Sequence, residues 1–195
     1  FLLFQDRFRA RGIEAVVCDP GELAYTEGQL RLEGRRIGFV YNRCTDFALA
    51  EPASAALRAA YLARAVAISP HPWSHALYAD KRNLALLGDR GFLAALGLDA
   101  DAVDCLAQCV PHTEVLNPAD AERLWAARRS LFFKPVAGYG GRAAYRGDKL
   151  TRRVWQEILQ ADYVAHAVLL PGQRMVQEHG TAQAMKFDLR AYSYA

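Results

Sequence analysis

The spacing of apolar residues changes between a helical and a strand-like period several times in the first 75 residues. Residues 1–11 place phenylalanine at every third or fourth position, which predicts a helix. An alanine-rich segment at about 53–64 predicts a second helix. Three short runs rich in Val, Ile and aromatic residues predict strands, and they lie at 13–18, 37–41 and 65–68. This order of helices and strands is typical of an α/β layer with a parallel or mixed sheet.

Turn signals and cap residues mark further elements between and after these strands. Residues 29–33 alternate polar and apolar side chains between Glu27-Gly28 and Glu33-Gly34, as a hairpin does. Helical patterns with cap residues then dominate the middle of the chain. Three helices are expected there, at 80–87, 89–96 and 101–109.

From Leu131 onward the pattern favours strands again, with one amphipathic helix among them. That helix is expected at 150–160, with Leu150, Val154 and Ile158 on one face. The expected strands lie at 131–136, 142–145, 163–170, 175–178 and 186–194. This part of the chain is therefore expected to form an antiparallel α+β unit.

Composition and charge narrow the class of protein. The chain has 195 residues, of which 52% are hydrophobic and 23% charged, the balance of a folded globular protein. A net charge of +3 is too small to indicate nucleic-acid binding by charge alone. No apolar run approaches the roughly 20 residues of a membrane span, and the opening Phe1-Leu2-Leu3-Phe4 is too short for a signal peptide. We expect a cytoplasmic protein that binds neither nucleic acid nor a membrane.

The four cysteines are scattered, so free thiols are expected rather than disulfides. Cys105 and Cys109 lie four residues apart on an expected helix, but no nearby His pair or Cys-x-x-Cys completes a metal site. The chain has no initiator Met and stops inside the strand-like run 189–194. We therefore expect it to be a piece of a longer protein.

A glycine-rich segment is the first candidate for chemistry. Gly138, Gly140 and Gly141 let the backbone approach a ligand closely and turn N–H groups toward it, as loops that hold phosphates do. The segment joins two expected strands, whereas the Rossmann fingerprint and the P-loop continue into a helix. A plain β-hairpin turn remains the alternative.

Two lysines favour the phosphate interpretation. Lys134 lies within an apolar strand, four residues before the glycines, and a partly buried ammonium group needs an anionic partner. The alternative is a lysine at the sheet edge whose ammonium group reaches water. Lys81 lies at the start of an expected helix, where the helix dipole disfavours a cation unless an anion is also bound. The alternative for Lys81 is a solvated lysine next to Asp80.

Two pairs of charged residues are further candidates. Arg43 and Asp46 follow an expected strand, at the carboxyl edge where α/β sheets bind ligands. Arg43 is a candidate for holding a substrate carboxylate, and a loop ion pair is the alternative. Asp188 and Arg190 alternate along the last expected strand and so share a face. They form either a cross-strand pair or part of a site where phosphate charge develops.

The order of these motifs resembles that of the ATP-grasp superfamily. The motifs are Asp80-Lys81, Val110-Pro111-His112-Thr113, Phe133-Lys134-Pro135 with its glycine loop, the strand 163–170, and Asp188-Leu189-Arg190. The first 75 residues also resemble the α/β domain that precedes the grasp in glutathione-synthetase-like members. The resemblance covers most of the chain.

The resemblance implies a role for each phosphate candidate. Lys81 and Lys134 would contact the phosphates of the nucleotide. Gly138, Gly140 and Gly141 would form a flexible flap over those phosphates.

The resemblance also implies a catalytic residue and an adenine site. Arg190 would face the transferring phosphate. The hinge strand would offer backbone atoms to adenine, and the matching residues are Val164, Ala165, His166 and Ala167. The family hinge often carries Gln-Glu, whereas this chain has Ala165-His166-Ala167 there.

The expected fold class is therefore α/β followed by α+β. A pre-ATP-grasp Rossmann-like domain would span 1–75, a helical bridge that begins the ATP-grasp domain 76–128, and an incomplete ATP-grasp α+β subdomain 129–195. The resemblance implies an ATP-dependent carboxylate–amine (or thiol) ligase that acts through an acyl phosphate, with ATP and Mg²⁺ as cofactors. Its carboxylate and amine partners are not identified by the sequence.

Two points qualify the implied activity. The family's magnesium ligands follow the Asp-x-Arg strand, so they would lie beyond residue 195 and no metal ligand is expected within this chain. A nucleotide-binding module without ligase activity is one alternative, and a structural α/β domain whose glycine loop is only a turn is another.

Overall fold

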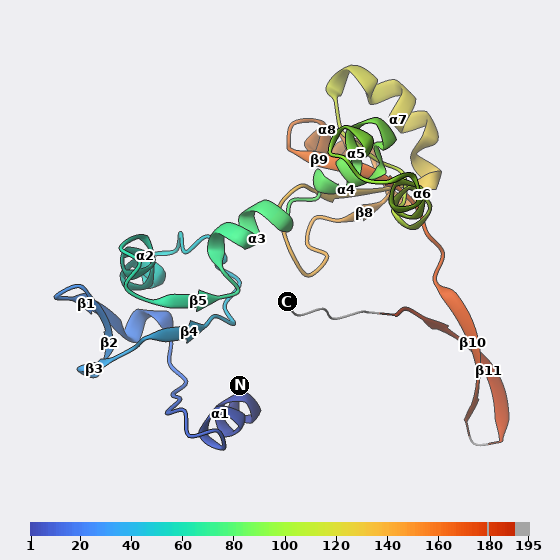
Figure 1. Cartoon of the computed structure of the whole chain (residues 1–195). Helices are drawn as coiled ribbons and strands as arrows, with labels where there is room; N and C mark the ends of the chain where they lie inside the picture. The colour runs from blue at the N-terminus through green and yellow to red at the C-terminus, as the bar shows by residue number, and fades with distance from the viewer. Residues whose placement is uncertain (179, 190–195) are drawn as a thin grey trace. The chain divides into compact units, whose positions relative to one another are not determined.

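The computed structural model describes residues 1–178 and 180–189, and the chain divides into two compact units (Figure 1). Unit 1 is Phe1–Asp80 and unit 2 is Lys81–Ala195. In the described part of the chain, none of the helices has the length and apolar character needed to cross a membrane.

Unit 1 contains two small separate sheets. Strands β1 (Leu23–Thr26), β2 (Gln29–Leu32) and β3 (Arg35–Arg36) form an antiparallel sheet in chain order, and β4 (Phe39–Tyr41) pairs in parallel with β5 (Ala67–Ser69). Its helices are α1 (Leu2–Arg9), α2 (Ala55–Leu62) and α3 (Pro72–Tyr78), with 3₁₀ turns η1 (Pro20–Glu22) and η2 (Pro52–Ser54). The α/β character expected for this region is present, whereas its Rossmann-like identity stays a prediction.

Two tight turns set the register of the antiparallel sheet. Glu27 and Gly28 have φ values of 52° and 71°, and Glu33 and Gly34 have 48° and 79°. Two successive positive φ angles form the turn whose twist matches that of paired strands. The hairpin expected around 29–33 is confirmed.

The run at 13–18 was expected to be a strand, and this prediction is wrong. Its backbone is bonded by side chains of α1 instead, because the carbonyl of Ala15 accepts hydrogen bonds from Gln5 Nε2 at 3.0 Å and from the Arg9 guanidinium at 3.0 Å. A β-rich sequence forms a strand only where a neighbouring strand is available to pair with it.

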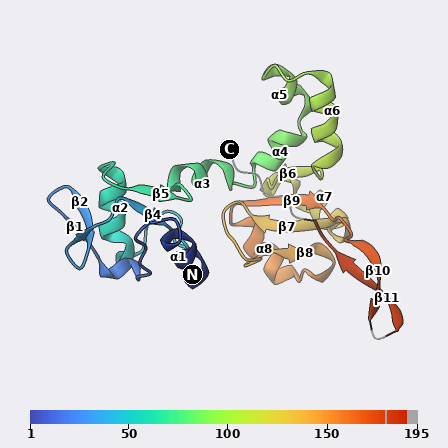
Figure 2. The same cartoon turned by 60° about the horizontal axis from the view of Figure 1, so that its bottom comes forward.

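Unit 2 contains a four-stranded sheet, a separate hairpin and several helices (Figure 2). The sheet has the order β6 (Thr113–Val115), β9 (Tyr163–Ala167), β7 (Leu131–Pro135), β8 (Tyr145–Arg146), and all its pairs are antiparallel. The helices are α4 (Asn83–Gly88), α5 (Arg90–Ala95), α6 (Ala100–Cys109), α7 (Ala121–Ala127) and α8 (Arg152–Leu159). Three 3₁₀ turns complete it: η3 (Pro118–Asp120), η4 (Arg128–Ser130) and η5 (Gly147–Lys149).

The core of unit 2 lies between the sheet and helix α8. Trp155 is 1% exposed, and its ring meets that of Phe133 on β7 edge to face, with centroids 5.3 Å apart. Ile158, one helical turn further, is also buried in this cluster. The helix starts where the Thr151 hydroxyl accepts a hydrogen bond from the backbone of Val154, a normal N-cap. The amphipathic helix expected at 150–160 and the antiparallel α+β unit are both confirmed.

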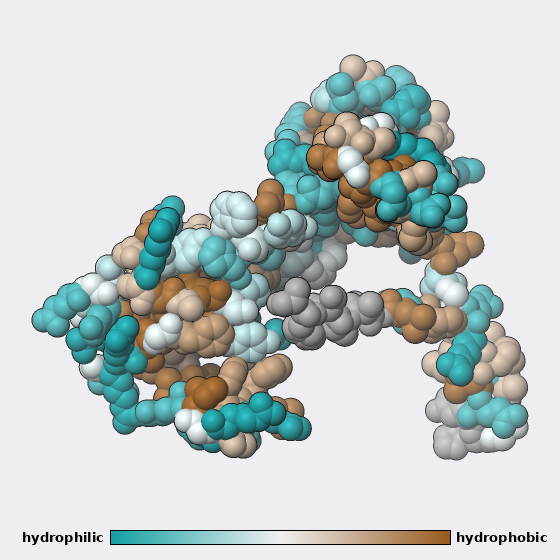
Figure 3. Space-filling model, in the orientation of Figure 1, coloured by the Kyte–Doolittle hydropathy of each residue, from teal (hydrophilic) through white to brown (hydrophobic). Residues whose placement is uncertain are grey.

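The hairpin of β10 (Gly172–Glu178) and β11 (Thr181–Phe187) forms a two-stranded sheet of its own. Met175, Val176 and Met185 are exposed on it, and Figure 3 shows apolar patches between hydrophilic ones on this hairpin. Of the strand expected at 186–194, the first two residues belong to β11, residues 188–189 follow its end, and residues 190–194 lie outside the described residues.

Gly147 marks the closest backbone packing in unit 2. A Cβ atom at this position would lie 1.9 Å from the carbonyl oxygen of Arg128 and 2.9 Å from that of Leu131. Turn η5 therefore rests directly on turn η4, and only glycine fits between them.

We predict that Gly147→Ala destabilises unit 2 by about 1–3 kcal/mol, because overpacking forces a backbone shift. Gly88→Ala is the matched control, since a Cβ there meets nothing within 4 Å. Urea unfolding of the two variants measures the difference. Equal midpoints for Gly147→Ala and the parent chain would contradict the packing described here.

Candidate functional site

The strongest candidate site is a cavity of about 200 Å³ in unit 2, under the connection between β7 and β8. Its lining combines cationic side chains with glycines and contains no carboxylate. The lining residues are Lys81, Lys134, Pro135, Gly138, Tyr139, Gly140, Gly141, Arg142 and Ala144. The structure thus brings together all five residues that the sequence proposed for phosphate contacts.

Strand alternation places Lys134 in the cavity. Leu131 and Phe133 point into the core, so Phe132 and Lys134 project from the opposite face of β7. The Lys134 ammonium nitrogen lies 5.2 Å from the centroid of the Phe132 ring, within cation–π range.

Lys81 reaches the same cavity through backbone bonds. Its N–H donates to the carbonyl of Val136 at 3.0 Å, directly after β7. Its ammonium group donates to the carbonyl of Gly138 at 3.1 Å. The sequence suggested that Lys81 lies at the start of a helix. Helix α4 begins at Asn83, so Lys81 lies two residues before it.

The two lysines line one cavity whose lining contains no carboxylate. Burial lowers the pKa of Lys134, and the charge of Lys81 lowers it further. Like charges held close together cost free energy unless an anion joins them. The cavity is therefore suited to a ligand that carries several negative charges.

The glycines form an irregular turn between two strands, as their spacing predicted. Gly138, Gly140 and Gly141 have φ values of 138°, 63° and 71°, a conformation that favours glycine strongly over residues with a Cβ atom. Nothing lies within 4 Å of a Cβ built on Gly140 or Gly141. The backbone of this turn is consequently open to a ligand.

Two residues of the cavity were missed from the sequence. Arg142 lies over the Tyr139 ring at 5.3 Å and donates to its hydroxyl at 3.3 Å. The signal was present, because a tyrosine interrupts the glycines and an arginine follows them directly. Arg142 supplies the third positive charge of the lining.

The chain resembles known proteins in structure but not in sequence. No protein-family model and no curated protein sequence matches the chain. Solved structures of the ATP-grasp ligase PsnB do match. The complex with a minimal precursor, Mg and ADP aligns with a TM-score of 0.50 at 20% identity, over 94% of this chain and 70% of that one.

Two further PsnB structures give the same result. The complex with a minimal precursor has a TM-score of 0.52 at 18% identity, over 94% of this chain and 72% of that one. The complex with the precursor peptide PsnA2 and AMPPNP has a TM-score of 0.50 at 21% identity, over 87% of this chain and 61% of that one. The chain has the ATP-grasp fold.

The residues expected to form the adenine hinge lie on β9, and their role stays a prediction. Strand β9 pairs with β6 on one side and with β7 on the other, so the sheet uses the backbone groups of Val164, Ala165, His166 and Ala167. Val168 N–H donates to the carbonyl of Ser130. Leu169 and Leu170 follow and are 68% and 79% exposed. Backbone outside the strand pairing of the sheet therefore begins after Ala167.

The side chain of His166 packs against the neighbouring strand β7. Its ring stacks on Phe132, with centroids 5.7 Å apart, and its Nε2 atom is buried without a hydrogen-bond partner among the described residues. Burial lowers the pKa of His166, and the charge of Lys134 lowers it further. The neutral imidazole is thus favoured beside Lys134.

The two substrate-binding candidates of unit 1 do not form a pair. The Arg43 guanidinium lies over Tyr41 at 5.7 Å. The Asp46 carboxylate accepts backbone hydrogen bonds from Ala50 at 2.8 Å and Glu51 at 3.0 Å. Desolvation works against ionisation of Asp46, but these bonds and one from the Ser54 side chain lower its pKa overall. Asp46 therefore closes its own loop, and the loop ion pair with Arg43 is not formed.

The remaining predictions concern the catalytic arginine, the metal ligands and Asp188. Arg190, the expected catalytic residue, lies outside the described residues. Within 1–178 and 180–189, no three His, Cys, Asp or Glu side chains come together in a way that could hold a metal ion. Asp188 lies after β11 rather than on a strand.

We predict that Lys81→Gln raises the pKa of Lys134, because it removes the positive charge that acts on it. The free energy of unfolding at neutral pH should rise as a result. A lowered pKa of Lys134 destabilises the folded state at low and neutral pH, and this penalty disappears only as the pH rises through the titration range of Lys134. NMR titration of the methylated lysines follows the change. Lys149→Gln, outside the cavity lining, is the control, and an unchanged Lys134 titration in Lys81→Gln would contradict the coupling.

Proposed function

We propose that the cavity of unit 2 binds the phosphates of ATP and that the chain is part of an ATP-dependent ligase. The observation that carries this proposal is the group of three cations, Lys81, Lys134 and Arg142, around an open glycine turn with no carboxylate in the lining. At about 200 Å³ the cavity is smaller than the roughly 300–1,000 Å³ of a pocket for a whole drug-sized ligand. It suits the phosphate end of a nucleotide.

Each group in the cavity has a role in this proposal. Ammonium and guanidinium groups form strong charge-assisted hydrogen bonds to phosphate oxygens. Backbone N–H groups of a glycine-rich turn add further donors without added charge. An incoming phosphate also removes the repulsion between the two lysines, so binding gains free energy that the empty cavity lacks.

The ligase reaction follows from charge neutralisation and positioning. A substrate carboxylate oxygen attacks the γ-phosphorus, the bond from that phosphorus to the β,γ-bridging oxygen breaks, and ADP leaves with the electron pair. An amine (or thiol) then attacks the acyl carbon, inorganic phosphate leaves, and the amine releases a proton. Lys81, Lys134 and Arg142 would hold the phosphates during the first step, with Arg190 beside the transferring group.

Adenine would lie beyond the end of β9 in this proposal. The exposure of Leu169 and Leu170 supports this position, since the preceding residues are paired within the sheet. Exposed leucine side chains there also give an adenine ring an apolar surface.

Magnesium is assigned no step. The PsnB structures include complexes with Mg and ADP, and such a metal neutralises phosphate charge during transfer. The described residues of this chain offer no group of carboxylates for it, so they do not fit a metal site. The charge neutralisation that the described residues themselves supply comes from the three cationic side chains.

We predict that Lys134→Ala weakens ATP binding about tenfold or more, because a charge-assisted bond to phosphate contributes roughly 1.5–3 kcal/mol. Isothermal titration calorimetry with ATP measures the affinity. Lys149→Ala is the matched control, since it removes the same charge outside the cavity lining. Lys134→Arg should recover part of the affinity.

The outcomes separate the possible functions. Equal affinities for Lys134→Ala and the parent chain would exclude the role of Lys134, whereas no ATP binding at all would favour a structural α/β domain. Binding by the parent protein without substrate-dependent ADP release would favour a nucleotide-binding module.

A further inference from the structure

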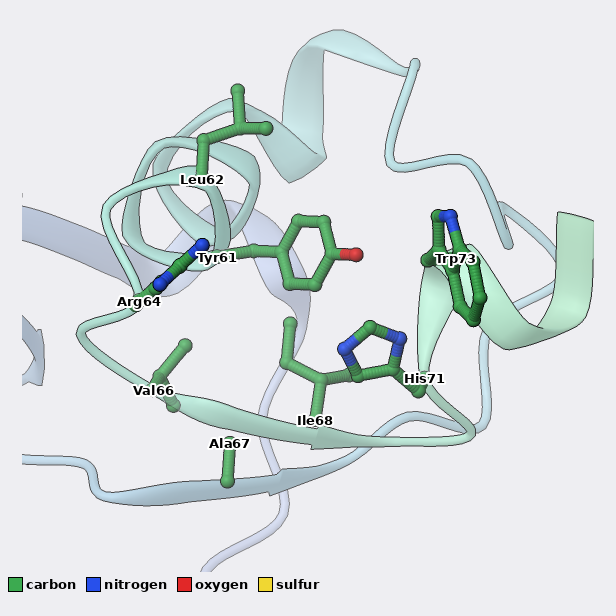
Figure 4. A pocket seen from close by; sticks show the side chains of 8 residues that line it. All are labelled: Tyr61, Leu62, Arg64, Val66, Ala67, Ile68, His71 and Trp73. Carbon is green, nitrogen blue, oxygen red and sulfur yellow. The ribbon is translucent and has the colours of Figure 1, made fainter.

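A second and larger cavity lies in unit 1, with a volume of about 710 Å³. It is formed between the C-terminal end of α2, strand β5 and the start of α3 (Figure 4). Its volume falls within the roughly 300–1,000 Å³ of cavities that bind small molecules. None of its lining residues belongs to the phosphate cavity.

The floor and one wall of this cavity are apolar and well ordered by packing. Val66 and Ile68 are 8% and 6% exposed and belong to the core of unit 1. Above them the rings of Tyr61 and His71 meet edge to face, with centroids 5.3 Å apart. A bound molecule would therefore meet a preformed surface.

Trp73 provides an aromatic surface at one end of the cavity. It is 62% exposed, and among the described residues its ring stacks on no other ring and on no cation. Leu62 is 68% exposed on the same cavity. Large apolar side chains that gather in a concave surface indicate a binding site.

Arg64 provides the one guanidinium of the cavity, and no carboxylate belongs to the lining. Arg64 forms no ion pair among the described residues. Figure 4 shows Arg64 and Trp73 at opposite ends of the lining, with Tyr61 and His71 between them. A guanidinium group recognises a carboxylate through two parallel hydrogen bonds.

We infer that unit 1 binds an elongated apolar carboxylate, with an aromatic group at Trp73 and the carboxylate at Arg64. The aromatic ring is held by stacking and by burial of apolar area. The apolar chain between the two ends covers Val66 and Ile68. This site and its ligand class are independent of the ATP proposal, because they rest on residues of unit 1 alone.

NMR titration with 5-phenylpentanoate tests the inference. The chain has three tryptophans, so three indole N–H signals report separately on Trp73, on Trp125 and on the buried Trp155. Trp73→Phe assigns the Trp73 signal by its loss. The Trp73 signal should shift with a saturable dependence on 5-phenylpentanoate, while the other two stay in place.

Two comparison ligands test whether binding depends on the carboxylate and on the length of the ligand. The uncharged 5-phenylpentanamide should bind about three- to fivefold more weakly, the size expected for an exposed ion pair. Benzoate lacks the apolar chain between ring and carboxylate and should also bind more weakly than 5-phenylpentanoate.

A pair of arginine variants identifies the cation responsible. Arg64 has φ 57°, and asparagine tolerates this conformation, so Arg64→Asn removes the charge with little backbone strain. Arg64→Asn should lose the preference for the acid over the amide, while the acid still shifts the Trp73 signal. Arg58→Gln removes a charge on α2, the helix that ends just before Arg64, outside the lining, and should keep the preference.

Three results would overturn the inference. The first is an unmoved Trp73 signal at ligand concentrations up to about 10 mM, well above a millimolar dissociation constant. The second is an equally large shift of the Trp125 or Trp155 signal, which would indicate non-specific binding. The third is an acid preference that survives in Arg64→Asn.

Discussion

The contact between Phe133 and Trp155 determines where the candidate phosphate site lies. Phe133 is fully buried, and the ring of Trp155 holds it against helix α8. Because side chains alternate along a strand, this fixed orientation of Phe133 turns Lys134 to the other face. The burial of one aromatic residue therefore positions the ammonium group on which the phosphate proposal depends.

Backbone bonds bring the second lysine to that position. Strand β7 ends at Pro135, and Val136 then bonds in two directions, with its N–H to Asp162 and its carbonyl to the N–H of Lys81. The side chain of Lys81 bonds to Gly138 just beyond. These backbone hydrogen bonds keep the two lysines in one cavity although their like charges repel each other.

The sequence contained enough information to predict Lys134 and the glycine turn, because strand alternation and positive φ angles are local properties. It also predicted the hairpin at Glu27-Gly28 for the same reason. The strand expected at 13–18 failed, since pairing depends on a partner that the local sequence does not specify. The hinge expected within β9 stays a prediction, and the sequence could not show that β9 is paired on both sides, because the position of a strand within a sheet is decided by the whole topology.

The two cavities differ in the ligands that they favour. The cavity of unit 2 is lined by three cations and no carboxylate, so the cost of desolvating its charges is offset best by a polyanion. The cavity of unit 1 has one guanidinium and an apolar floor, where a polyanion would leave most of its charge unpaired. If both proposals hold, each cavity disfavours the ligand class proposed for the other.

The depressed pKa of Lys134 has a consequence for chemical reactivity. A larger share of this lysine is the uncharged amine, and amines are the nucleophiles that acylating reagents modify. A ligase that makes an acyl phosphate beside such an amine risks acylating itself. Bound phosphates would restore the ammonium form, so the nucleotide that starts the reaction would also protect the lysine that holds it.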